Sequence, residues 1–386
     1  MPYGGKASYD FLMAKTNEED PWQKRFEVHY DGLQVMPVAR VFDLRGIEPL
    51  GRATGRNLLE WPKGPDGGIW NSGSISLTPP EGMRVAGPEL PASAGVAVEA
   101  RAGREPDLLT FAFPFGGGVD YRMQDGWIEL ANGQLATPST HITFDGRSRF
   151  GTETEIPFSV VSTDWQESDR LLAATMTAFG APTGTFAIDG AGRFDGVMLG
   201  DVSDPRVEAR FDGEGLRAWN VEWGHGAGEL VVENGYLDLS DGVFRRGAAQ
   251  LSVDGRFSLS RPRTDGGEEM NGVFRFSRFP SANIRAAFGL QEGYSIEGPT
   301  TGEVHLYGAY RRLFGFGRME LDHPTAYGEP FDAVSADLLF EGTGVRLNGL
   351  EIQKGEGTAT GAAFIEWDAS YSFNLDARNV GVDTIN

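Results

Sequence analysis

The sequence predicts a mostly β protein, in which many short antiparallel strands form a sheet accompanied by a few short helices. Glycine and proline are frequent, at 54 and 21 residues, and the dipeptide Asp-Gly occurs ten times. Apolar and polar residues also alternate over long stretches, which places the apolar side chains on one face of each strand. Asp-Gly supplies the positive φ angles of tight hairpins, so we interpret these dipeptides as turns.

Composition narrows the possible functions. The chain has 386 residues, 40% of them apolar, which is enough to bury a sizeable core. Its net charge of -21 repels phosphate backbones, so we expect no nucleic-acid partner. Cysteine is absent, which excludes disulfides, thiol catalysis and Cys-ligated metals.

One pattern recurs along the chain. The stretches 126–150 and 235–259 have the same length and the same placement of several Gly and Asp residues, at an offset of 235 − 126 = 109 residues. A looser third copy begins at Gly344. Their shared positions are Gly126/Gly235, Gly133/Gly242, Asp145/Asp254 and Gly146/Gly255. The predicted units are 1–125, with a Pro- and Gly-rich irregular segment near 61–103, then 126–234, 235–343 and the truncated start of a fourth over 344–386. We therefore expect the chain to be part of a longer one.

Short helices are predicted between the strand groups. They fall in the stretches 32–46, 163–180 and 280–289. Asp164 can cap the second helix, with Glu167 three residues further on, whereas Ser281 can cap the third and Gly289 can end it. We interpret these helices as plugs or edge covers for the sheet. A membrane-binding helix is the alternative, although the usual basic face is missing.

The apolar positions of the predicted strands share one face of the sheet, and the opposite face carries polar residues such as Glu129, Asp238 and Gln250. The candidate apolar face consists of Ile128, Leu130, Ile142, Phe144, Phe186, Ile188, Leu237, Leu239, Leu251, Val253, Phe257, Leu259, Val304, Leu306, Ile365, Trp367, Tyr371, Phe373 and Leu375. Such a sheet must hide this face, either by closing as a sandwich or by curling around an apolar ligand.

No motif for catalysis stands out. The five histidines lie far apart, no nucleophile elbow or P-loop is present, and the Gly-rich stretch 113–120 lacks the lysine that phosphate binding requires. A carboxylate pair for glycoside hydrolysis could be hidden among the 55 acidic residues, but nothing singles one out. We expect no enzymatic activity, no metal site and no cofactor.

The order of strands, short helix, Pro-Gly and strands resembles the AsmA/TamB-like superfamily of bacterial envelope proteins. The resemblance rests on NGQLATPSTHITFDGRSRFG (132–151), STDWQESDRLLAATM (162–176), PTGTFAIDGAGRFDG (182–196) and GAAFIEWDASYSFNLDARNVGVDTIN (361–386). It extends from about residue 100 onward and more faintly over 1–62, whereas the segment 61–103 departs from the pattern.

This resemblance implies an elongated, curled antiparallel sheet, the repeating β-groove or β-taco, whose concave face conducts phospholipid acyl chains between the inner and outer membranes. It implies that the candidate apolar face lines this groove. It also implies a periplasmic location, as part of an inner-membrane-anchored protein of a Gram-negative-type bacterium. The implied partners are phospholipids and, through parts of the chain not present here, an outer-membrane barrel protein and inner-membrane proteins. TamB-like members are also linked to outer-membrane biogenesis and protein translocation and assembly.

An alternative function remains open. A β-sandwich or solenoid module for binding or adhesion would recognise carbohydrate or protein, with tryptophans such as Trp127 and Trp223 as candidate sugar platforms. A sandwich would have a dry interior and would bind no fluorescent fatty acid, which separates the two hypotheses.

Overall fold

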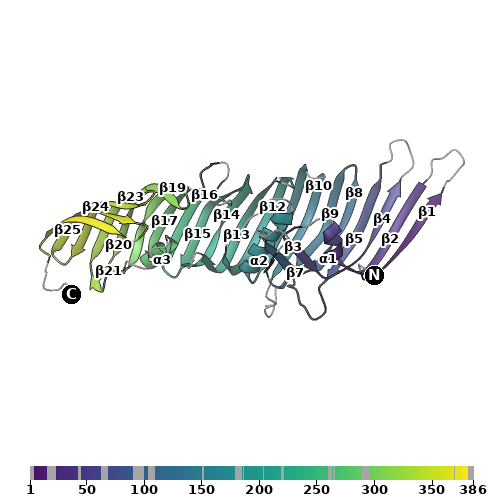
Figure 1. Cartoon of the computed structure of the whole chain (residues 1–386), viewed down its shortest axis with the longest axis horizontal. Helices are drawn as coiled ribbons and strands as arrows, with labels where there is room; N and C mark the ends of the chain where they lie inside the picture. The colour runs from purple at the N-terminus through teal and green to yellow at the C-terminus, as the bar shows by residue number, and fades with distance from the viewer. Residues whose placement is uncertain are drawn as a thin grey trace. The chain divides into compact units, whose positions relative to one another are not determined.

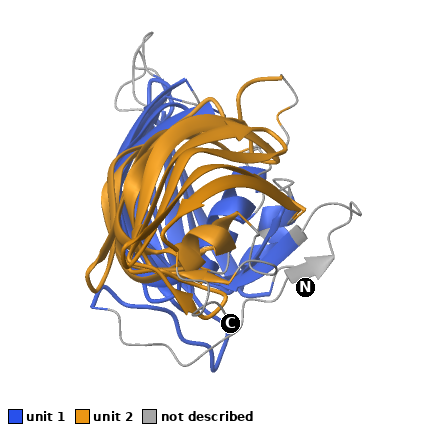
Figure 2. Cartoon of the chain, turned by 90° about the vertical axis from the view of Figure 1, so that its left-hand side faces the viewer, with its two compact units in different colours: residues 1–186, 190–210 blue, residues 187–189, 211–386 orange. Residues whose placement is uncertain are grey.

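The structure is a computed structural model. It describes residues 4–14, 23–41, 45–61, 68–89, 100–102, 109–149, 152–178, 185, 187–202, 204–218, 221–259, 263, 266–288, 295–368 and 370–380. The predicted fold class is confirmed: 72% of the structure is strand, and a single long antiparallel sheet of 20 strands dominates it. The strands follow one another in chain order (Figure 1). The chain divides into two compact units, residues 1–186 with 190–210 and residues 187–189 with 211–386 (Figure 2).

The first unit contributes nine strands and the beginning of a tenth to this sheet. They are β1 (Lys6–Ala14), β2 (Gln23–Gln34), β4 (Arg52–Trp61), β5 (Trp70–Thr78), β8 (Gly116–Gln124), β9 (Trp127–Ala136), β10 (Thr140–Arg149), β11 (Glu153–Ser162), β12 (Asp189–Asp201) and β13 (Asp204–Ala218). A small second sheet joins β3 (Ile47–Leu50), β7 (Leu109–Pro114) and β6 (Ala100–Ala102). Two helices, α1 (Val35–Val41) and α2 (Trp165–Ala178), complete the unit.

The second unit continues with the end of β13 and ten further strands. They are β14 (Val221–Glu233), β15 (Tyr236–Arg246), β16 (Ala249–Ser258), β17 (Met270–Pro280), β19 (Pro299–Ala309), β20 (Arg312–Asp322), β23 (Ala333–Glu341), β24 (Gly344–Lys354), β25 (Gly357–Glu366) and β26 (Tyr371–Arg378). Its helix is α3 (Ser281–Ala287), and β18 (Ile296–Glu297), β21 (Thr325–Ala326) and β22 (Glu329–Pro330) form a small sheet.

The repeated stretches fold into hairpins of identical register. All eight residue pairs between β9 and β10 recur 109 residues later between β15 and β16. Trp127 faces Arg149 as Tyr236 faces Ser258, and Leu130 faces Gly146 as Leu239 faces Gly255. The sequence period therefore corresponds to a strand register, even though few side chains are kept.

The interpretation of Asp-Gly as a turn marker is wrong for these hairpins. Asp145 lies inside β10 and Asp254 inside β16, each opposite a β-bulge. The bulged residues Asn132 and Asp241 have φ of 54° and 51°. Their backbone N–H groups donate to Asp145 Oδ1 at 2.6 Å and to Asp254 Oδ1 at 3.0 Å. The carboxylate thus satisfies the N–H that a bulge removes from the ladder.

The helices lie where the sequence predicts them. The Gln166 N–H donates to Asp164 Oδ1 at 2.9 Å, which confirms the cap of α2. The predicted Ser281 cap is wrong, because Pro280 precedes α3 and the Ser281 hydroxyl instead donates to the Ile296 carbonyl at 2.9 Å. Gly289 lies outside the described residues. Figure 2 shows that the strands of each unit curve and that the helices lie on the concave side of their own unit.

Candidate functional site

In the first unit, one face of the sheet carries the predicted apolar residues, and we call it the inner face. Strand pairing aligns Leu135 with Ile142 and Ile142 with Val160. Leu171 of α2 packs with Phe113 of β7, and Leu135 and Ile142 pack against this cluster. The inner face is therefore the face that α2 and the small sheet cover. They cover it near the end of β11, where the chain continues into α2.

On β9, β10 and β11, away from α2, the inner face of the first unit is apolar and half-buried. The predicted residues Ile128, Leu130 and Phe144 are all half-buried there, and Phe144 pairs with Phe158 of β11. None of them belongs to a core cluster of the described residues, whereas Ile142 does. A strip of apolar surface thus continues from the packed cluster towards the opposite edge, and among the described residues no second layer packs as core against it.

Phe144 lies flat along this strip. Its strand partner is Gly133, and a Cβ built on Gly133 would meet the Phe144 ring at 2.6 Å. The ring therefore occupies the space above the glycine and does not project away from the sheet. Two further predicted positions precede β12 and give less information: Ile188 is half-buried, and Phe186 lies outside the described residues.

In the second unit, part of the predicted face is closed. Leu251, Val253, Val304 and Leu306 are buried in packed clusters. Phe257, Ile365 and Trp367 pack against these clusters, as does Leu239, whereas Leu237 and Leu259 are half-buried outside them.

Phe288, at the end of α3, helps to close the predicted apolar face of the second unit. Its ring stacks on Trp367 with centroids 5.7 Å apart and lies 5.9 Å from the Phe340 ring. The part of the predicted apolar face that lies beneath this aromatic stack is a core. In the second unit, an open apolar surface is therefore limited to the predicted residues outside the packed clusters.

The last three predicted residues share this face but are exposed. Tyr371 pairs with Ile365, Phe373 with Ala363, and Leu375 with Gly361. Tyr371 and Phe373 are 56% and 63% exposed, and their rings stack with centroids 5.8 Å apart. Among the described strands, β26 pairs only with β25.

The opposite face is lined by paired charges. Arg256 binds Asp238 through two hydrogen bonds of 2.7 and 2.9 Å, and these raise the pKa of the guanidinium. Arg275 likewise contacts both Asp254 and Glu303. Such exposed pairs keep the face hydrated and contribute little stability each.

One apolar patch on the outer face was not predicted from the sequence. Phe316 lies between His305 and Leu339 in the strand register, and Phe316 and Leu339 are 57% and 40% exposed. The His305 and Phe316 rings meet edge to face at 5.4 Å. Alternation predicts polar residues here, but His305, Tyr307, Phe314 and Phe316 place aromatic rings on this face of β19 and β20 instead.

Four polar residues on the inner face were also missed. Tyr30, Asn57, Asn71 and Tyr121, which we call the polar seat, come from β2, β4, β5 and β8. The Tyr121 hydroxyl donates to Asn57 Oδ1 at 2.7 Å. Burial raises the pKa of Tyr30 to about 12 and raises that of Tyr121, so both phenols stay neutral. In the strand alternation, these four residues fall on the same face as the apolar residues, and this pattern could have indicated them from the sequence.

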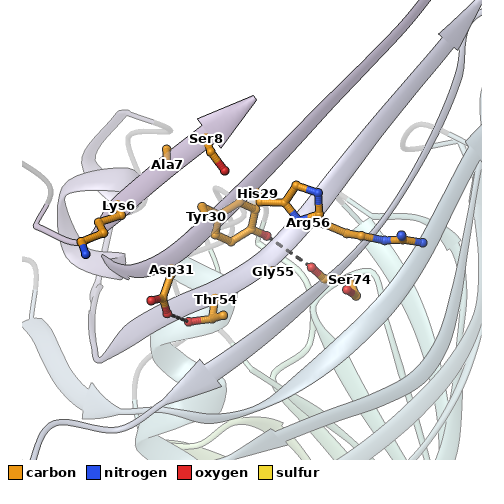
Figure 3. A pocket seen from close by; sticks show the side chains of 11 residues that line it. Lys6, Ala7, Ser8, His29, Tyr30, Asp31, Thr54, Gly55, Arg56 and Ser74 are labelled. Atoms are coloured by element: carbon orange, nitrogen blue, oxygen red, sulfur yellow. Dashed lines mark hydrogen bonds between the residues drawn. The ribbon is translucent and has the colours of Figure 1, made fainter. Parts of the chain in front are cut away.

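An open depression lies over the first strands of this unit (Figure 3). Its volume is about 850 Å³. Thr54 donates to Asp31 Oδ1 at 3.1 Å in its wall, and the Tyr30 hydroxyl donates to the Ser74 carbonyl at 3.4 Å. Its other lining residues are Gly5, Lys6, Ala7, Ser8, His29, Gly55 and Arg56.

A buried carboxyl ties α2 to the sheet. Glu167 is 2% exposed and accepts hydrogen bonds from the Thr137 hydroxyl, at 2.5 Å, and the Ser139 N–H, at 2.9 Å. Burial raises the pKa of this carboxyl against the effect of these bonds. Glu167 therefore joins the helix to the β9–β10 connection, a role that the capping position expected from the sequence does not include.

The described residues show no arrangement for metal chemistry: no three or more His, Cys, Asp or Glu side chains converge to hold an ion. No helix in the described part of the chain has the length and apolar character needed to cross a membrane. No family model, curated protein or solved structure matches the chain.

Proposed function

We propose that this chain is a lipid-conducting segment whose inner face holds acyl chains. The observation that carries the proposal is the apolar strip of the first unit, where Leu130, Phe144 and Phe158 are half-buried and lie outside the packed clusters. A second layer of protein would make such a strip a core, and an acyl chain can cover it in the same way.

The energetics favour a passive mechanism. Moving one methylene from water to an apolar surface gains about 0.8 kcal/mol, so a sixteen-carbon chain resists entering water by about 12 kcal/mol. A continuous apolar surface removes most of this barrier while the head group stays hydrated. The strip needs no catalytic residue for this, and we propose that the protein is not an enzyme.

The wider setting of the proposal comes from the resemblance to the AsmA/TamB-like superfamily. In this setting the cargo is phospholipid, the location is the periplasm of a Gram-negative-type bacterium, and lipid passes between the inner and outer membranes. Partners at the two membranes, including an outer-membrane barrel protein, would bind other parts of a longer chain.

Photo-crosslinking tests the proposal directly. A photoreactive residue at Leu130 should yield phospholipid adducts, whereas the same residue at Glu129, its neighbour on the outer face, should yield none. The hairpin repeat offers a second pair, Leu237 and Asp238, at the register positions of Ile128 and Glu129, and Leu237 lies outside the packed clusters. Adducts at Glu129 and Asp238 without adducts at the leucines would contradict the proposal.

A polar-ligand module is a second candidate function. The depression in Figure 3 favours it, because Ser8, Thr54 and His29 offer hydroxyl and imidazole groups suited to a carbohydrate. Titration with soluble oligosaccharides, monitored by the chemical shifts of His29, tests this candidate. Saturable shifts together with no binding of a fluorescent fatty acid would favour it over lipid conduction.

A further inference from the structure

The polar seat lies within the apolar inner face of the first unit. Tyr121 is the strand partner of Leu130 on one side and of Gly73 on the other, and Gly73 pairs with Asn57. Residues that pair in register point to the same face of a sheet. The seat therefore shares the surface on which we propose that acyl chains lie.

Two glycines hold the phenols of the seat close to the sheet. A Cβ on Gly55 would meet the Tyr30 hydroxyl at 2.8 Å, and a Cβ on Gly73 would meet the Tyr121 hydroxyl at 2.6 Å. Each ring consequently lies over the glycine of a neighbouring strand. This arrangement places the hydroxyl oxygens at the floor of the inner face.

The amides of the seat are only partly satisfied. Asn57 Oδ1 accepts from Tyr121, which orients the amide and leaves its NH₂ group as the donor side. Asn71 donates to the Met123 sulfur at 3.5 Å, a weak acceptor. Asn71 Oδ1 is buried and accepts no hydrogen bond. A buried acceptor without a partner is costly, and a ligand that donates a hydrogen bond would remove this cost.

We infer that the polar seat binds the glycerol-ester end of an acylated lipid, while the acyl chain lies on the adjoining apolar strip. This inference rests on the proposed function. An ester carbonyl matches the Asn57 NH₂ donor, and a neighbouring hydroxyl matches the unpaired Asn71 oxygen. None of the four seat residues carries a charge at neutral pH, so the seat selects a neutral oxygen-bearing group rather than a phosphate.

Competition between two fluorescent probes on the full chain tests this inference. One probe is a pyrene-labelled monoacylglycerol, and the other is a pyrene-labelled alkane of the same chain length. Wild-type protein should bind the monoacylglycerol about tenfold more tightly, as expected for two hydrogen bonds of ordinary strength. N57L and N71L should each remove one of these bonds, reduce the preference to about threefold and leave alkane affinity unchanged. Y307F, which changes a phenol on the outer face, is the matched control and should keep the preference.

Circular dichroism of each variant checks that the sheet is intact. N71L removes a buried unpaired oxygen and should fold even where N57L does not. Equal binding of both probes by wild type, or an undiminished preference of about tenfold in folded N71L and N57L, would overturn the inference. If wild type binds the alkane without preferring the ester, the inference about the polar seat is refuted and the proposed function stands. If neither probe binds, both fail.

Discussion

The substitution L130D probes the apolar strip at its half-buried centre. Strands lie about 4.8 Å apart, so about four methylenes of an acyl chain cross each strand, worth about 3 kcal/mol if fully withdrawn from water. An open face shields only one side of the chain, which reduces this to about 1.5 kcal/mol. We therefore expect L130D to weaken fatty-acid binding by about tenfold.

Fluorescence titration with a labelled fatty acid measures this effect. Leu130 lies outside the packed clusters, so L130D should lower the free energy of unfolding by only about 1 kcal/mol. Glu129→Gln, at the adjacent position on the outer face, should leave the dissociation constant unchanged. A folded L130D protein with wild-type affinity would refute the assignment of this face to acyl chains.

Three further substitutions test the packing around the strip. G133A should lose about 1–3 kcal/mol of stability in urea unfolding, because its Cβ would lie 2.4 Å from the Phe144 carbonyl oxygen; wild-type stability would show that this contact relaxes freely. L306A should lose about 2–5 kcal/mol, since Leu306 is 4% exposed, yet keep fatty-acid affinity in the first unit; weakened binding there would contradict the separation of core and strip. Burial raises the folded-state pKa of Glu167, so the contribution of this carboxyl to stability should be largest below its unfolded-state pKa and be lost as pH rises through its folded-state pKa. E167Q should lack this loss in unfolding measured across the same pH range, and parallel pH profiles would exclude the carboxyl as its source.

The sequence predicted the fold class and the positions of the helices well because both depend on local pattern. Alternation defines strand faces, and Asp164 caps α2 as its side chain suggests. The hairpin period was also readable, since matching glycines recur where strands bulge or turn. Local pattern could not distinguish an Asp-Gly turn from an Asp-Gly inside a strand, because the bulged residues that Asp145 and Asp254 bind lie 13 positions earlier, on the paired strand.

The candidate site was harder to predict, because exposure depends on what packs against a strand. Val304 and Leu130 have the same apolar character, yet Val304 is buried in the cluster around Phe340, whereas no cluster of the described residues includes Leu130. The polar seat depends on which residues become neighbours across four strands. Asn57 and Tyr121 are 64 positions apart, and no local pattern connects them.

The identical register of the two hairpins affects how such a chain can change length. Six strands, β9 to β14, separate the start of one hairpin from the start of the next. Since six is even, gaining or losing this block returns the backbone to the same edge, running in the same direction, with Tyr236 in the place of Trp127. Duplication of the encoding DNA can therefore add or delete a whole block without inverting which side chains face inward. A change by an odd number of strands must alter a connection to restore that parity.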